Sequence, residues 1–467
     1  MRMLLLLLGA GCATAGSAPS SPAAAPATSA AGPMDSPRNA KPLLLRGATV
    51  WTATGKTHAP GEVLIVDGRI QEVGERVSVP PGAVVMDLPG RHVTPGIIDT
   101  HSHLGVYPAP HIEAVSDGNE ATAPVTAEVE AAHGFWPLDP GIPRALAGGV
   151  TAMQVLPGSA NLIGGRGFTV KLRPGRSARA MRFPGAPDGL KMACGENPKR
   201  VYGRDRKAPP MTRMGNVAGY RAAFSRAREY RDRWDFYRRQ LQDWEKKPVA
   251  ERKERPPPPD RNLQMETLVG AIEGRILVHV HCYRADEMLL MLEIADEFGF
   301  RVRSFHHAVE AYKIRDHLAR REVGASTWAD WWGFKLEAFD GIQENAALLA
   351  AAGGRSIIHS DSGIGMQRLN QEAAKAYYKG RAMGLDLTED EALRWVTINP
   401  AWALGIDKSV GTLEPGKMGD VVVWSGHPLS VYSHAEKVLL DGVVAYDLSA
   451  RPATPSDFET GLGEVGP

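Results

Sequence analysis

The sequence predicts an α/β protein in which a (β/α)₈ barrel is joined to a small β-sandwich formed by both ends of the chain. Two patterns predict this fold class. Between residues 94 and 405, apolar strand-like runs alternate with helical patterns, which is typical of parallel βα units. Residues 42–93 and 406–450 instead carry short β-rich runs separated by Gly and Pro, with matching lengths and turn chemistry. We therefore expect the two ends to pair and the middle to form the barrel.

The first 41 residues precede this fold and resemble the export segment of a bacterial lipoprotein. Residues 1–12 combine one arginine, a leucine run too short to span a bilayer, small residues and Cys12. Cleavage before Cys12 would make it the first residue, so we expect a lipid on Cys12 as the only membrane anchor. This indicates a periplasmic or outer-membrane lipoprotein, with plain secretion as the alternative. Residues 13–41 are rich in Ala, Ser and Pro and are expected to form a disordered tether.

The barrel pattern is irregular in two places. One of the eight strands expected in a closed barrel is less clear than the others, and the best candidate is FTVKLRP at residues 168–174. A charged helical pattern that ends in a proline run interrupts the barrel near residues 211–262. We expect a solvated helical excursion from a βα loop there, and a lid or a contact within a homo-oligomer is the alternative.

The composition excludes one class of partner. The chain has 467 residues, of which 43% are hydrophobic, enough for a large core and a second, smaller domain. Its 54 Lys and Arg residues balance 53 acidic ones, so the net charge of +1 provides no field that attracts nucleic acid. We expect a small-molecule or peptide substrate and no nucleic-acid partner.

Two histidines end the first barrel strand, in the stretch GIIDTHSHLG. Side chains alternate along a strand, so His101 and His103 point the same way, and barrel active sites lie at the carboxyl ends of the strands. The two imidazoles therefore predict a chelated metal ion.

Three later strands end in similar side chains, His281, His307 and Asp361. Nitrogen and oxygen ligands in this mixture suit Zn²⁺ and similar divalent ions, and a bound metal lowers the pKa of water toward ~7. Asp361 is then placed to accept the proton as hydroxide attacks. Cys194 and Cys282 have neither zinc-finger nor disulfide-framework spacing, so thiolate ligation is not indicated.

These motifs resemble those of the metal-dependent amidohydrolase superfamily, and within it the imidazolonepropionase-related branch. The stretches that carry the resemblance are VTPGIIDTHSHLG, GGVTAMQVLPGSANLIGGRG, GLKMACGENPKRVYG, HHAVEAYK, SDSG, VTINPAWALGI and VGTLEPGKMGDVVVWSG. The resemblance implies a distorted barrel with a composite β-sandwich. It also implies that five residues match the family's metal ligands and general base: His101, His103, His281, His307 and Asp361.

The same resemblance decides between neighbouring histidines. In HCYRADE the family pattern begins at His281, which leaves His279 as a neighbour with either a supporting or a structural role. In FHHAVEAY the pattern selects His307, and we interpret His306 as a packing residue on the other face of the strand.

The number of metal ions depends on GLKMACGENPK. In several relatives a lysine that ends the fourth strand reacts with CO₂ and bridges two metals, and Lys191 is the candidate here because burial would favour its neutral amine. Two alternatives stay open. In the first, Lys191 forms an ion pair with Glu196 or Glu120. In the second, Glu196 is itself the bridging ligand.

Loops after the strands offer candidate substrate contacts. Glu120 lies in DGNEATAPVT, where a turn-stabilising role for the neighbouring polar residues is an alternative, and Asn161 lies in the glycine-containing SANLIGGRG. Trp331 and Lys335 belong to TWADWWGFK, whose tryptophans are either loop anchors or substrate contacts.

Taken together, the sequence predicts a metal-dependent hydrolase with one or two divalent ions, Zn²⁺ being the first choice. We expect it to cleave an amide or cyclic amide C–N bond by attack of metal-bound hydroxide, with Asp361 as the general base. A dipeptidase or prolidase-like peptidase is the alternative enzyme. A binding protein that has the fold without the chemistry is the alternative from another class.

Overall fold

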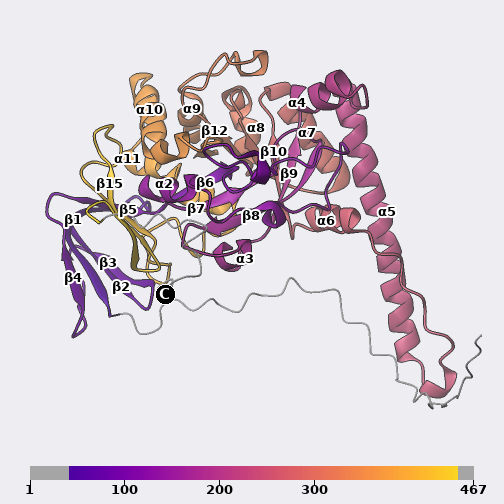
Figure 1. Ribbon diagram of the computed structural model, residues 1–467, viewed down its shortest axis with the longest axis horizontal. Helices are drawn as coiled ribbons and strands as arrows, with labels where there is room; N and C mark the ends of the chain where they lie inside the picture. Colours follow the sequence, from indigo (N-terminus) through magenta and orange to yellow (C-terminus); the bar gives the residue numbers. More distant parts are fainter. Residues whose placement is uncertain (1–40, 451–467) are drawn as a thin grey trace, which may run out of the picture.

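The computed structural model describes residues 41–450. The predicted signal segment 1–12 with Cys12, and the predicted tether 13–41 apart from its last residue, lie outside the described residues. In the described part, one eight-stranded sheet forms the barrel, and its strands follow one another in sequence order (Figure 1). They are β6 (Ile97–Ser102), β7 (Val150–Val155), β8 (Ile163–Lys171), β9 (Gly189–Ala193), β10 (Leu277–His281), β11 (Val302–His306), β12 (Gly324–Thr327) and β13 (Arg355–Ile358).

One barrel strand runs against the others. β8 contains most of the uncertain stretch FTVKLRP, which confirms the strand, but it pairs antiparallel with both β7 and β9. The expectation of parallel units throughout is therefore wrong at this strand. Residues 156–162 join β7 to β8, and such a connection is too short for the helical crossover that a parallel strand requires, which takes about a dozen residues.

Helices cover the outside of the barrel, and α7 shows why they pack there. Its buried residues Met288, Met291, Leu292, Ala295 and Phe298 recur at helical spacing and join the hydrophobic core around β9 to β11. The described helices are α1 (Ala131–Gly134), α2 (Gly141–Ala147), α3 (Ala178–Met181), α4 (Glu196–Pro198), α5 (Arg213–Lys246), α6 (Leu263–Ile272), α7 (Ala285–Phe298), α8 (Arg315–Arg320), α9 (Asn345–Ala351), α10 (Leu369–Ala382), α11 (Glu389–Arg394) and α12 (Ile398–Ala403).

A second eight-stranded sheet joins the two ends of the chain, as predicted. Its central contact is the antiparallel pair of β5 and β14, so the early strands (indigo) and late strands (yellow) lie side by side in Figure 1. The strands are β1 (Leu43–Trp51), β2 (Thr57–Val66), β3 (Arg69–Gly74), β4 (Val84–Asp87), β5 (His92–Pro95), β14 (Val421–Trp424), β15 (Ala435–Leu440) and β16 (Val443–Asp447).

A buried ion cluster fastens this sheet to the barrel. Lys171, at the end of β8, places its Nζ 2.9 Å from Asp420 Oδ1 and 2.5 Å from Asp441 Oδ1. The lysine side chain is fully buried, so both carboxylates are needed to offset the cost of removing its charge from water.

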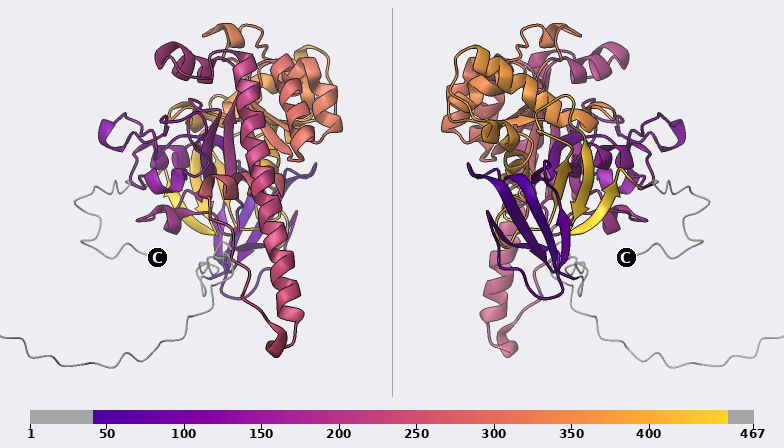
Figure 2. Two further views of the ribbon diagram at one scale, coloured as in Figure 1. Left: turned by 90° about the vertical axis from the view of Figure 1, so that its right-hand side faces the viewer. Right: turned by 90° about the vertical axis from the view of Figure 1, so that its left-hand side faces the viewer.

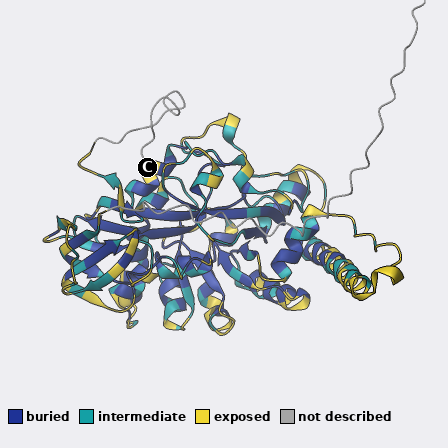
Figure 3. Cartoon of the chain, turned by 90° about the horizontal axis from the view of Figure 1, so that it is seen from below, coloured by how far each residue is buried: buried dark blue, intermediate teal, exposed yellow. Residues whose placement is uncertain are grey.

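The predicted charged excursion is α5, the longest of the described helices. The part of α5 up to Tyr230 buries Tyr220, Phe224 and Tyr230 against the barrel. Its second half projects away from the body of the molecule and is mostly exposed, as Figures 2 and 3 show. Among the described helices, none is both long enough and apolar enough to cross a membrane.

Candidate metal centre

Three histidines and one aspartate meet at the carboxyl ends of the barrel strands. His101 lies on β6 and His103 just beyond it, and their Nε2 atoms are 3.3 Å apart. Asp361 Oδ1 lies 3.2 Å from His103 Nε2 and 3.6 Å from His101 Nε2, while Asp361 Oδ2 lies 3.7 Å from His307 Nε2. The four predicted residues therefore surround one point.

His307 and Asp361 reach this point through unusual backbone conformations. His307 directly follows β11, Asp361 lies three residues after the end of β13, and both have positive φ angles, of 58° and 49°. Non-glycine residues seldom adopt this left-handed region, and those that do are concentrated at functional sites. The turn directs the His307 side chain toward Asp361.

This turn explains why the prediction for His306 is wrong. His306 is still part of β11 and points into the barrel, where its Nδ1 lies 2.8 Å from His101 Nδ1. Alternation of faces holds only inside a strand, so the turn at His307 places both neighbours on the inner side. His306 is a hydrogen-bonding partner of the site and not a packing residue.

Hydrogen bonds to backbone carbonyls determine which ring nitrogens are free. His103 Nδ1 lies 2.8 Å from the oxygen of Leu156, and a carbonyl only accepts, so this nitrogen carries the hydrogen. His359 Nδ1 likewise donates to Thr327 O at 3.0 Å, so His359 Nε2 accepts from His307 Nδ1 at 2.8 Å. The Nε2 lone pairs of both His103 and His307 are therefore directed into the cluster, as metal ligation requires.

His281 completes the set of predicted histidines from β10. Its Nδ1 lies 2.8 Å from Ser159 Oγ, and its Nε2 lies 3.4 Å from the side-chain nitrogen of Asn197. Its ring centroid is 4.6 Å from that of His307. Burial lowers the pKa of His281 well below its usual value, with Lys335 adding a smaller effect, so the ring is neutral and able to bind a cation.

Lys191 lies beside His101 and has no acidic partner among the described residues. Its Nζ lies 2.9 Å from Pro157 O and 3.3 Å from His101 Nε2, and the residue is 1% exposed. Burial lowers the pKa of Lys191 to about 7. The structure does not pair it with Glu196 or Glu120. Glu196 instead lies 3.6 Å from Lys335, and Glu120 is exposed.

The other predicted substrate contacts surround the centre at different depths. Trp328 stacks on His307 with ring centroids 4.7 Å apart, and Trp331 stacks on the outer face of Trp328 at 4.9 Å. A cavity of about 340 Å³ opens beside these two tryptophans. Lys335 Nζ lies 3.9 Å from the ring centroid of Tyr283 and 3.0 Å from Glu337 Oε2.

Asn161 holds a loop in place and does not line the centre. It is buried, and its side-chain nitrogen donates to the carbonyls of Glu120 and Ala123, so it holds the loop that follows β6. Neither Asn161 nor Glu120 contacts the histidine cluster.

Sequence reasoning did not identify two buried residues that organise the centre. His359 orients His307, as described above. Asp99 accepts hydrogen bonds from the backbone nitrogens of His101 at 3.0 Å and Ser360 at 3.2 Å, which links β6 to the turn that carries Asp361. The stretches IIDTHSH and IIHSDSG contain both residues, so polar side chains within apolar strands were the available signal.

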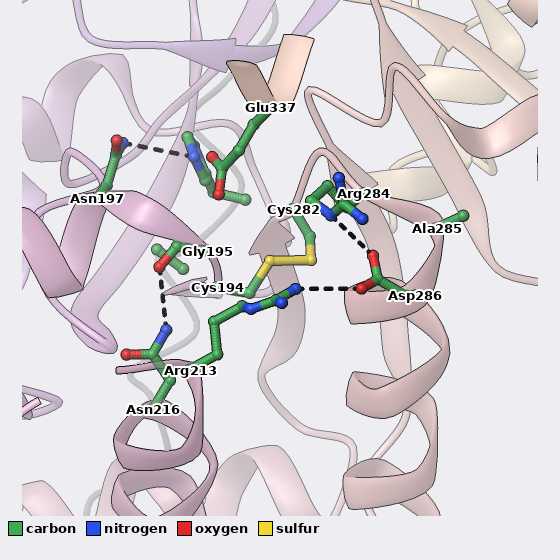
Figure 4. The surroundings of a disulfide bond; sticks show 12 residues. Cys194, Gly195, Asn197, Arg213, Asn216, Cys282, Arg284, Ala285, Asp286 and Glu337 are labelled. Carbon is green, nitrogen blue, oxygen red and sulfur yellow. Dashed lines mark hydrogen bonds and ion pairs between the residues drawn. A yellow bond between two sulfur atoms is a disulfide. The ribbon is translucent and has the colours of Figure 1, made fainter. Parts of the chain in front are cut away.

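A disulfide was also missed. Cys194 and Cys282 follow the last residues of β9 and β10, with their Cα atoms 5.3 Å apart (Figure 4). The bond therefore joins the strand of Lys191 to the strand of His281. Its cysteines are 88 residues apart in sequence, so no local spacing reveals them.

The donor set of this centre fits a divalent metal ion. Two groups of ligand atoms converge closely enough to hold one, namely His101, His103 and Asp361, and His101, His307 and His359. Imidazole nitrogens with a carboxylate are the ligands that Zn²⁺ and related ions prefer. Burial lowers the pKa of both His101 and His307 well below the usual value, which keeps these rings neutral.

Comparisons with known proteins point to one family. The Amidohydrolase family model matches residues 339–446. The chain is similar to an amidohydrolase from Thermotoga maritima whose crystal structure is known. The two sequences are 37% identical, the match covers 87% of this chain and 100% of the other, and the TM-score is 0.77.

Two curated relatives extend the comparison. The amidohydrolase tasK of Hapsidospora irregularis is 34% identical over 442 residues and covers 87% of the chain, but the chain spans only 43% of that protein. An imidazolonepropionase of Cereibacter sphaeroides is 26% identical over 406 residues, which covers 78% of the chain and 89% of that protein.

Proposed function

The chain belongs to the amidohydrolase family, and from that premise we propose that it hydrolyses a C–N bond in an amide or cyclic amide. The observation that carries this proposal is the convergence of His101, His103 and His307 on Asp361, with the lone pairs of His103 and His307 directed inward. Nearly all of the predicted ligand types are present at that one point, which favours an enzyme over a binding protein without chemistry.

The chain's own residues would hold the metal and move the proton. His101, His103, His281, His307 and Asp361 are the residues that would bind a divalent cation. Such a cation supplies Lewis acidity, which lowers the pKa of water toward ~7 and polarises a carbonyl oxygen. Asp361 is one quarter exposed and faces the open side of the cluster, so its carboxylate can take a proton from the attacking water and deliver it to the leaving nitrogen.

The aromatic side chains restrict how a substrate approaches. Trp328 and Tyr283 are buried and stack against His307, so they hold the ring in place and keep water away from that side of the centre. Trp331 is 38% exposed on the outer face of Trp328 and offers an apolar surface at the mouth.

A substrate screen with metal-loaded protein tests the proposal. Purified protein is loaded with Zn²⁺ and offered N-acyl amino acids, dipeptides and cyclic amides, with release of amine or ring opening as the readout. Asp361→Asn is the matched control, because it removes the proton acceptor but keeps an oxygen ligand. We expect its kcat to fall by 10²–10⁴-fold while the metal content is largely kept.

Two results would contradict the proposal. Retention of more than about one tenth of the wild-type kcat in Asp361→Asn would exclude this residue as the general base. Failure of the wild type to bind divalent metal would favour the binding-protein alternative.

We further propose that the protein is exported. The N-terminal sequence with Cys12 is the first support. The disulfide is the second, because such bonds persist mainly in oxidising compartments.

A further inference from the structure

A chain of three buried histidines runs from the candidate metal centre into the barrel. His101 Nδ1 lies 2.8 Å from His306 Nδ1, and His306 Nε2 lies 2.9 Å from His279 Nδ1. All three residues are 0% exposed. Both ring nitrogens of His306 are therefore used within the chain, and its ring, carried by β11, joins a histidine of β6 to one of β10.

The number of hydrogens on the three histidine rings fixes which ring donates in each hydrogen bond once a metal binds. A neutral imidazole carries one N–H, and full burial without an acidic partner in these hydrogen bonds favours that form for all three rings. If His101 Nε2 offers its lone pair to a metal, His101 Nδ1 must donate to His306 Nδ1. His306 Nε2 must then donate to His279 Nδ1, so that His279 Nε2 also carries a hydrogen.

That last hydrogen needs an acceptor, and Gln154 on β7 offers one. His279 Nε2 and Gln154 Oε1 are both buried and both lack a hydrogen-bonding partner within residues 41–450. Both side chains flank Gly189: a Cβ placed there would lie 2.9 Å from His279 Cδ2 and 2.4 Å from Gln154 Nε2. A half-turn of the Gln154 amide exchanges the positions of its nitrogen and oxygen, so the oxygen then takes the place beside Gly189 that the nitrogen holds here.

We propose that His306, His279 and Gln154 form a hydrogen-bonded relay that sets the tautomer of His101 and so directs its Nε2 lone pair into the metal centre. The three are positioning residues. With the amide oxygen of Gln154 facing His279, the relay presents a lone pair at His101 Nε2. With the amide nitrogen facing His279, every hydrogen bond of the relay runs in the opposite direction, and His101 Nε2 carries a hydrogen instead of a lone pair. The inference rests on the metal binding in the proposed function.

This relay gives His101 a property that its neighbours lack. His103 is held by a backbone carbonyl, and His307 is held by His359, which is itself held by one. Carbonyls only accept, so the tautomers of these two ligands are fixed before metal arrives. An amide can donate or accept, so whether His101 joins them depends on the orientation of Gln154, together with Lys191 Nζ, which lies 3.3 Å from His101 Nε2.

Metal affinity of matched variants tests the relay without any assay of activity. The full-length protein is titrated with Co²⁺ in competition with a chelator, for wild type, Gln154→Leu and Gln154→Glu. Leucine removes the acceptor, whereas a carboxylate is an acceptor of nearly the same shape. We expect Gln154→Leu to bind Co²⁺ at least tenfold more weakly than Gln154→Glu, within the 10–100-fold typical of residues that support metal ligands. A smaller ratio overturns the relay.

Ser326→Ala is the control for loss of a polar group in the same barrel interior. Ser326 Oγ is buried and bonds only Thr100 Oγ1 and Ser304 Oγ, at 3.0 and 3.1 Å, in the hydrogen bonds seen here. Its variant should bind Co²⁺ as the wild type does, and an equal loss in Ser326→Ala would show a general effect on the barrel and overturn the proposal.

A second pair keeps the test decisive if the Gln154 variants do not fold. In His279→Asn the amide oxygen replaces Nδ1 as the acceptor for His306, whereas His279→Leu has no acceptor. The same tenfold ratio is expected, with folding checked by thermal unfolding of the metal-free protein. A wild type that binds no Co²⁺ defeats the proposed function, while a binding wild type with a ratio below ten defeats the relay alone.

Discussion

His359 holds the ring of His307 through a hydrogen bond of 2.8 Å between His359 Nε2 and His307 Nδ1. His359 is itself fixed by its 3.0 Å contact with the carbonyl of Thr327. The left-handed turn brings His307 into the centre, and the bond from His359 to Nδ1 leaves His307 Nε2 as the nitrogen that faces Asp361. A residue outside the proposed ligand set thus orients one that belongs to it.

We expect His359→Phe to weaken Zn²⁺ binding by about 10–100-fold, because phenylalanine fills the space but accepts no hydrogen bond. His359→Gln keeps an acceptor at the end of the side chain and should retain most of the affinity. Chelator competition measures both. Loss of one whole metal ion in both variants would mean that His359 is a ligand and not an orienting residue.

Metal stoichiometry should depend on Lys191. Burial lowers its pKa to about 7, so a large share of the amine is neutral at physiological pH and able to react with CO₂ to give a carbamate. We expect two divalent ions per wild-type chain and one per Lys191→Ala chain, counted by metal analysis after loading in bicarbonate.

Glu196→Gln is the companion variant for this experiment. Loss of the second ion only in Glu196→Gln would assign the bridge to Glu196. One ion in the wild type, or two in Lys191→Ala, would exclude the carbamate.

Glu287 should make the protein less stable as the pH rises. It is 7% exposed on α7, its Oε2 has no hydrogen-bonding partner among the described residues, and burial raises its pKa from 4.5 to about 7. The folded state therefore holds the proton more tightly than the unfolded state, so stability falls between about pH 4.5 and pH 7.

We expect Glu287→Gln to raise the free energy of unfolding by up to about 3 kcal/mol at pH 8 and to change it little at pH 4, in urea titrations of metal-free protein. Glu293→Gln, on the exposed face of the same helix, serves as the comparison. An equal effect of the two substitutions, or an effect of Glu287→Gln that does not vary with pH, would contradict this assignment.

Cell fractionation tests the proposed anchor. Cys12→Ser should move the protein from the membrane fraction to a soluble one, because acyl chains on Cys12 would be its only attachment. Ala13 follows the cysteine, and bacterial lipoproteins of this kind favour the outer membrane. Unchanged membrane association of the serine variant would argue against lipidation.

The sequence predicts the barrel and most of the centre because these depend on local patterns. Alternating apolar runs identify the strands, and His101, His103, His281 and Asp361 stand at strand ends where side-chain direction follows from the chain itself. The pairing of the two chain ends was predictable for the same reason, since their strands share length and turn chemistry.

The features that the sequence did not predict depend on contacts between distant segments. The antiparallel direction of β8 follows from a short loop, and the inward position of His306 follows from a turn one residue later. Both partners of His359, and the Ser360 partner of Asp99, come from distant segments, so these hydrogen bonds had no signature in any single stretch. For the same reason, the pairing of Cys194 with Cys282 became visible only in three dimensions.

The disulfide next to Lys191 and His281 also has a consequence for how the protein is prepared. It ties the ends of β9 and β10, the two strands that carry these side chains, so reduction of the bond removes a covalent tie from one side of the candidate centre. We therefore expect metal binding to weaken in thiol reductant, as comparison of oxidised and reduced protein would show. Choice of expression host, and omission of thiol reductants from the buffers, then decide whether a preparation keeps this tie.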